Sequence, residues 1–160
     1  MTNPIQSKNA ITVEQLILAC RHVEEMQNIG VSENLAIRTL ELFADFYAKL
    51  LMGGSPTPHH VAQVNLWSKE AKKKLKAVPD AVPRDCFRVE HGTPRREFAR
   101  MVMELYQKDN LSERSMKRLV TRYWKLAVIT LEEDRKLNKV ARSKKFDTPE
   151  ERWAEAKIKF

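Results

Sequence analysis

Hydrophobic residues recur along this chain at the three- and four-residue spacing of amphipathic α-helices, and strand-like alternation is hard to find. Helix-start signals precede these periodic runs. Thr12 is followed by Gln15 at the spacing of a capping box, in which each side chain bonds the other residue's backbone. Thr148 precedes Pro149, which fits the first position of a helix because it lacks an N–H. The pattern predicts helices near residues 13–28, 33–52, 58–76, 94–108, 113–127, 131–142 and 149–157.

Glycine is scarce, with four in 160 residues, and together with the helical periodicity this predicts an all-α fold. The expected architecture is a single-domain bundle of about seven helices, with one short irregular or extended segment near residues 77–92. A chain of this length buries a core without disulfides or metals. We expect one domain over residues 1–160. The alternative division is an N-terminal core part, 12–76, and a basic C-terminal part, 93–160.

The predicted helix near 33–52 is expected to lie at the centre of the core. Leu35, Leu42, Phe46 and Leu50 fall on one side of it at helical spacing, and Ile37, Leu40 and Phe43 widen this apolar stripe. We therefore expect the stripe to pack against the other helices.

The cysteines and the N-terminus bear on where the protein works. There are two cysteines, Cys20 and Cys86, and no Cys-x-x-Cys pair. A disulfide-stabilised fold needs more, so both are interpreted as reduced thiols of a cytoplasmic protein. The first ten residues are polar and lack the apolar core of a signal peptide, and no apolar run reaches the length of a membrane span. We expect no membrane partner.

The formal net charge of +8 is concentrated in the second half of the chain. Residues 1–80 carry nine Lys and Arg against eight acids, whereas residues 81–160 carry twenty against thirteen. One interpretation is a basic surface that serves solubility alone. The other is a polyanionic partner for the C-terminal half.

Within the predicted helix 113–127, charge and hydrophobicity separate onto opposite faces. At about 100° per residue, all of its cations fall within an arc of about 140° that contains no acid. These cations are Arg114, Lys117, Arg118, Arg122 and Lys125. Met116 and Val120 fall on the opposite side, which is expected to be buried. A one-sided strip of this kind predicts binding to a polyanion, of which nucleic acid is the commonest.

We therefore expect non-catalytic binding of a DNA or RNA backbone by the C-terminal half of the chain. Further phosphate contacts are expected from cations that flank the strip, namely Arg95, Arg96, Arg100, Lys139, Arg142, Lys144 and Lys145. An acidic protein is the alternative partner, because its recognition needs the same side chains. In that alternative the chain is a protein-interaction subunit, for example of a phage or a defence system. A homodimer and a subunit of a larger complex both stay open.

Two neighbouring features of this basic region have local explanations. The helices near 94–108 and 113–127, joined by a short loop, resemble a helix-turn-helix pair but lack the usual turn glycine. A second basic run is interpreted as wrapping around its own helix. It follows the preference of a helix C-terminus for cations and consists of Lys69, Lys72, Lys73, Lys74 and Lys76.

Arg84 and His91, separated by six residues, form the one pair that suggests catalysis. Their spacing resembles the Arg-x4–6-His motif of metal-independent ribonucleases of the HEPN class, which are helical and usually dimeric. The resemblance implies that His91 takes part in proton transfer at the 2′-hydroxyl and that Arg84 holds the scissile phosphate. It covers eight residues and the helical class. Asp85 stands where that family more often has Asn or His.

No metal and no cofactor are expected. A structural zinc site needs four well-spaced ligands. The histidines form no such spacing with one another or with the cysteines; they are His22, His59, His60 and His91. The chain also lacks a Gly-rich phosphate loop, so a nucleotide-driven enzyme is not expected.

Overall fold

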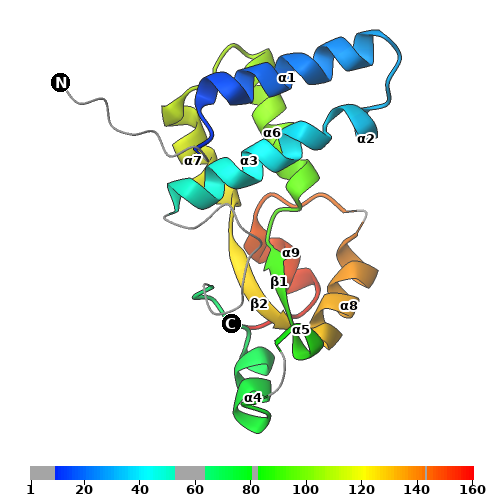
Figure 1. The fold of residues 1–160 in the computed structure, drawn as a ribbon. Coiled ribbons are helices and arrows are strands. Elements are labelled where there is room, and N and C mark those ends of the chain that lie inside the picture. Colours follow the sequence, from blue (N-terminus) through cyan, green and yellow to red (C-terminus); the bar gives the residue numbers. More distant parts are fainter. Residues whose placement is uncertain (1–9, 53–63, 81–82, 143) are drawn as a thin grey trace, which may run out of the picture. The chain divides into compact units, whose positions relative to one another are not determined.

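The computed structural model describes residues 10–52, 64–80, 83–142 and 144–160, and it confirms a mostly helical fold with one small sheet (Figure 1). The described elements are, in order, α1 (Val13–Asn28), α2 (Glu33–Ala36), α3 (Arg38–Leu51), α4 (Lys69–Ala77), α5 (Pro83–Cys86), β1 (Phe87–His91), α6 (Arg95–Gln107), α7 (Glu113–Tyr123), β2 (Leu126–Thr130), α8 (Leu131–Ala141) and α9 (Pro149–Glu155). None of the described helices is long and apolar enough to cross a membrane.

The chain divides into two compact units, and each is built from two separate stretches of sequence. Unit 1 consists of Met1–Thr57 and Pro94–Thr121, and unit 2 consists of Pro58–Thr93 and Arg122–Phe160. The expectation of one domain stays a prediction.

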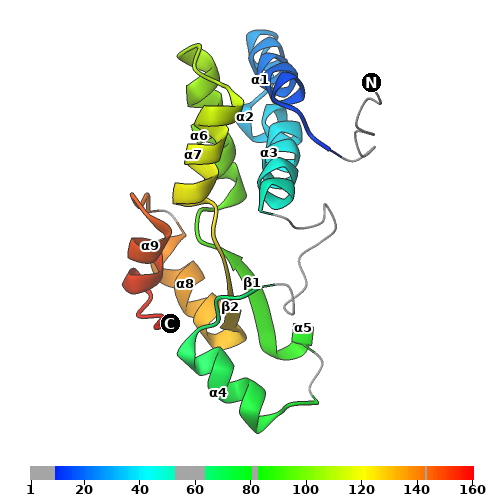
Figure 2. The same cartoon turned by 90° about the vertical axis from the view of Figure 1, so that its left-hand side faces the viewer.

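Unit 1 is a helical bundle in which α3 packs against both α1 and α6 (Figure 2). Leu16 of α1, Leu40 of α3 and Phe98 of α6 are almost fully buried and form part of its core. The start of α1 confirms the predicted capping box: the Thr12 hydroxyl accepts from the Gln15 N–H at 3.2 Å, and the Thr12 N–H donates to the Gln15 amide at 2.9 Å. Reciprocal bonds of this kind satisfy donors that a helix start leaves unpaired.

The predicted helix near 33–52 is interrupted at Ile37, and only part of its predicted apolar stripe is buried. Ile37 and Leu40 are almost fully buried, as expected. Leu35 is 62% exposed and Leu42 is 47% exposed, whereas Ala44 and Ala48 are fully buried. Apolar residues surround this helix, so spacing alone does not select the packed face. The side that the structure buries carries Leu40 together with the two alanines.

Unit 2 is built around an antiparallel pair, β1 and β2, whose register runs from Phe87 opposite Thr130 to His91 opposite Leu126. Alternate residues of β2 point to opposite faces. Ile129 belongs to a cluster with Leu137 of α8 and Trp153 of α9, whereas Val128 packs with Phe87 and with Ala71 of α4. The pair is therefore covered on both sides.

The predicted helix 113–127 ends at Tyr123, because the chain from Leu126 to Thr130 is strand β2 instead. The helical assignment of residues 124–127 is therefore wrong. The sequence Leu-Ala-Val-Ile-Thr is an unbroken apolar run of the kind that strands covered on both faces require. Such a short run fits a buried strand or a buried helix end equally well by periodicity.

The predicted helix near 58–76 is shorter than expected. Thr57-Pro58, His59 and His60 lie outside the described residues. The chain from Val64 to Trp67 is not helical, and Trp67 makes a parallel bridge with Val128 before α4 begins at Lys69. The segment near 77–92, expected to be irregular or extended, contains the short helix α5 followed by β1.

Candidate nucleic-acid interface

Helix α7 carries four exposed cations on the side opposite its buried residues. It begins after Ser112, whose hydroxyl accepts a hydrogen bond from the Ser115 N–H at 3.1 Å. Met116 and Val120 are fully buried. Arg114, Lys117, Arg118 and Arg122 are exposed, and we call these four residues the α7 basic face. They extend over about 12 Å of helix, at 1.5 Å per residue.

The charges of the α7 basic face are not neutralised by acids. None of the four side chains forms an ion pair with any residue that the structure describes. The Arg122 guanidinium lies 5.1 Å from the centre of the Tyr123 ring, a distance typical of a cation–π contact. The one acid of α7 is Glu113, at the helix start, where a negative charge favours the helix dipole. The face therefore presents concentrated positive potential to solvent.

Lys125, predicted to lie on the same helix face, is in the connection between α7 and β2 and pairs with Glu150. Burial alone would raise the pKa of the Glu150 carboxyl. The hydrogen bonds from Lys125 and from the start of α9 outweigh this, so that the pKa is lowered. A lysine held by an ionised acid is less available to a phosphate.

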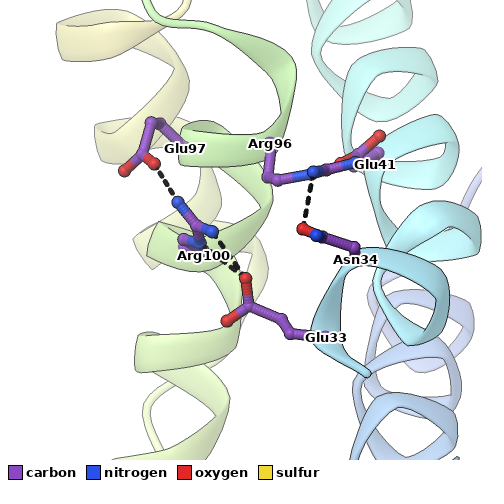
Figure 3. A network of polar contacts seen from close by, with 6 residues as sticks. All are labelled: Glu33, Asn34, Glu41, Arg96, Glu97 and Arg100. Atoms are coloured by element: carbon purple, nitrogen blue, oxygen red, sulfur yellow. Dashed lines mark hydrogen bonds and ion pairs between the residues drawn. The ribbon is translucent and has the colours of Figure 1, made fainter. Parts of the chain in front are cut away.

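Arg96 and Arg100 are also held by acids, within unit 1 (Figure 3). The Arg96 Nε donates to Glu41 at 2.5 Å, and its Nη1 donates to Asn34 at 2.8 Å. Arg100 donates to Glu33 at 2.6 Å and also bonds an acid of its own helix. These contacts join α6 to α2 and α3. Both arginines, expected at the edge of the basic strip, therefore stabilise the bundle.

The cations at the C-terminal end of α8 are of two kinds. Lys144 pairs with Glu155, whereas Lys139, Arg142 and Lys145 are exposed and form no ion pair with the described residues. Sequence reasoning missed Arg135, which is also exposed. Its spacing of four and seven residues from Lys139 and Arg142 could have placed it on the same face. Arg95, on α6, is likewise exposed and without an ion pair in the described part of the chain.

The structure does not bring Arg84 and His91 together. Arg84 is on α5 with its side chain 87% exposed, 3.9 Å from Asp85, whereas His91 is the last residue of β1 (Figure 1). The strand between them spans about 13 Å from Phe87 to His91. The His91 ring is half-buried and meets the edge of Trp124, with 6.5 Å between ring centres. One chain thus lacks the paired geometry that the ribonuclease resemblance implies.

The part of the chain that the structure describes contains no group of three His, Cys, Asp or Glu residues placed to hold a metal ion. Cys20 is fully buried, and burial, with a smaller effect of Glu24, raises the pKa of its thiol to about 12. A thiol held neutral in this way is a poor nucleophile.

Comparison with known protein families, with curated proteins and with solved structures gives no match for this chain.

Proposed function

We propose that this protein binds the phosphate backbone of nucleic acids, without catalysis, through the α7 basic face. The observation that carries the proposal is the contrast between this face and other cations of the chain. Several of those cations are paired with an acid; they are Arg96, Arg100, Lys108, Lys125, Lys144 and Arg152. The four cations of α7 are exposed, lie on one helix face and keep their charge unpaired among the described residues.

Phosphate contacts of this type have a characteristic dependence on salt. Each contact releases counterions, so the logarithm of the binding constant falls with the logarithm of salt concentration by about 0.9 per phosphate on duplex DNA and about 0.7 on single strands. Four contacts on α7 predict a slope of about −3.6 on a duplex. Contacts to phosphates alone carry little sequence information, so we expect weak base preference. Arg95, Lys139, Arg142 and Lys145 are proposed as further contacts.

The test is a double charge reversal on the α7 basic face, Arg118→Glu with Arg122→Glu. We expect its affinity for labelled duplex DNA and single-stranded RNA to fall more than about tenfold at low salt, with a slope shallower by about two. The nucleic acid should stay intact on denaturing gels in EDTA. The binding constants can be measured by fluorescence anisotropy at several salt concentrations.

The control is Arg38→Glu with Lys108→Glu, which changes the net charge by the same amount at exposed positions outside α7. It should bind like the wild type. Equal binding by the wild type and both variants would contradict the proposal. A wild type that binds neither nucleic acid would also contradict it and would favour an acidic protein partner.

A further inference from the structure

Helix α4, in unit 2, is fixed at its start and projects beyond the two-stranded sheet (Figures 1 and 2). The Ser68 hydroxyl accepts from the Ala71 N–H at 3.0 Å and donates to Glu133 of α8 at 2.6 Å. The Lys69 N–H donates to the Lys159 carbonyl at 2.7 Å. Ala71 is fully buried, in a cluster with Val64, Phe87 and Val128. These contacts hold one side of the helix against unit 2.

The lysines of α4 do not wrap around the helix, as the sequence was interpreted; four of them share one face. At about 100° per residue they fall within an arc of about 100°, opposite Ala71. We call them the α4 lysine face; they are Lys69, Lys72, Lys73 and Lys76, and all are exposed. The fifth, Lys74, points elsewhere, and its Nζ lies 3.5 Å from Glu132 of α8. None of the four forms an ion pair within the described part of the chain.

The helix dipole does not account for this face. It favours cations in the last turn, where Lys74 and Lys76 lie, but opposes them in the first turn. Lys69 is the first residue of α4. The four lysines are also three or four positions apart, so they form like-charge pairs that destabilise the free helix. A bound polyanion would relieve this repulsion.

We propose that the α4 lysine face is a second binding surface for the nucleic-acid phosphate backbone. This inference rests on the proposed function for its class of ligand but uses different residues on a different helix. From Lys69 to Lys76 the face extends over about 10 Å. That length corresponds to about three successive phosphates of one DNA strand, at about 3.4 Å each along the axis. Lysine contacts phosphate as a point charge, which suits a backbone and selects no base.

The test compares salt slopes for labelled duplex DNA of about 30 base pairs, between about 50 and 200 mM salt. The variant replaces the four lysines by glutamine (Lys69→Gln, Lys72→Gln, Lys73→Gln, Lys76→Gln), which keeps helix propensity and removes the like-charge pairs. The α4 lysine face is expected to contact about three phosphates, so the slope of the variant should be shallower than that of the wild type by about 2.7. Circular dichroism checks its helix content.

Two further variants of the protein complete the experiment. The Arg118→Glu, Arg122→Glu variant and the Arg38→Glu, Lys108→Glu control each lower the net charge by the same four units as the glutamine variant. A slope unchanged in the glutamine variant but reduced in the α7 variant would overturn this inference and leave the proposed function standing. A slope reduced in the glutamine variant but unchanged in the α7 variant would support the α4 lysine face and overturn the role of α7.

A second variant, Lys72→Gln with Lys76→Gln, keeps the inference testable if the fourfold change does not fold. It should remove about two units of slope, and an unchanged slope would overturn the inference. Binding to vesicles that contain phosphatidylserine tests whether the phosphate group that the lysines recognise belongs to a lipid instead. Loss of vesicle binding in either glutamine variant, with DNA binding retained, would assign the surface to lipid and overturn the inference as stated.

Discussion

Gly92 follows β1 at a point where unit 2 has no room for a side chain. Its N–H donates to the Lys125 carbonyl at 2.8 Å. A Cβ at this position would lie 2.4 Å from the Cβ of Pro149 and 2.8 Å from Cζ2 of Trp153. Both neighbours belong to α9, so the missing side chain is what allows this helix to approach the end of the strand.

We expect Gly92→Ala to destabilise the protein by about 2–3 kcal/mol, because α9 must move to admit the methyl group. The free energy of unfolding from urea denaturation measures this change. Gly30→Ala is the matched comparison, since Gly30 has φ +90° but no atom within 4 Å of an added Cβ. Gly30→Ala should lower the free energy of unfolding by about 1 kcal/mol, from backbone strain alone. Equal losses at the two positions would contradict the steric explanation.

The sequence predicted which cations of α7 face solvent but not which cations elsewhere are paired. Exposure within one helix follows from local spacing, and Arg114 and Arg118 are exposed as expected. The partners of Arg96 and Arg100 on other helices, Glu41 and Glu33, lie 55 and 67 positions away in the chain. Such pairs depend on how the helices pack, which no local pattern encodes.

Helix starts were easier to predict than helix ends. Thr12 caps α1 through a box with Gln15, and Thr148 caps α9 with Pro149 in the first turn, both as predicted. Helix starts carry side-chain signals, whereas ends depend on backbone conformation. Lys157 terminates α9 with φ +58°, a conformation usually reserved for glycine.

Replacing Lys157 by glycine should therefore stabilise the protein. The Lys157 N–H donates to the Ala154 carbonyl and the Ile158 N–H donates to that of Trp153, the two bonds of a Schellman motif. Glycine keeps these bonds without the steric strain of a Cβ, so we expect a gain of about 1 kcal/mol in urea unfolding. Lys159→Gly, which removes the same charge at a residue without positive φ, should give no gain. A stability loss at Lys157 would contradict the strain argument.

The mostly helical class followed from periodicity, but the sheet did not. Strand β2, the apolar run from Leu126 to Thr130, forms hydrogen bonds with β1, which lies much earlier in the chain. This pairing, which no local pattern encodes, makes the run a strand. Residues 87–91 were ambiguous for the same reason, since a five-residue segment fits either element by itself. Long amphipathic segments such as α1 and α6 were predicted well because their own pattern is sufficient.

Charge is divided unequally between the two units. Unit 1 carries eleven Lys and Arg against ten acids, whereas unit 2 carries eighteen against eleven. Self-repulsion therefore acts mainly on unit 2. All three tryptophans, Trp67, Trp124 and Trp153, also belong to unit 2, so tryptophan fluorescence reports on this unit.

We expect added NaCl to raise the thermal midpoint of the tryptophan fluorescence change. About 0.5 M salt screens exposed charges and should stabilise unit 2 by about 1 kcal/mol, or about 5 °C for a unit of this size. The buried Arg152–Glu90 pair is screened less than the surface lysines. A midpoint that falls with salt would mean that surface ion pairs such as Lys125–Glu150 outweigh the repulsion.

The interleaving of the two units has a consequence for how the chain folds during synthesis. β2 begins at Leu126, 35 positions after β1 ends at His91. At about 5–20 residues per second, the ribosome needs about 2–7 s to make that stretch. Ala71 and Phe87 therefore leave the exit tunnel several seconds before Val128, the residue that later packs against them. The stretch between the two strands contains all of α6 and α7, so the nascent chain can complete unit 1 while half of unit 2 is still exposed to chaperones.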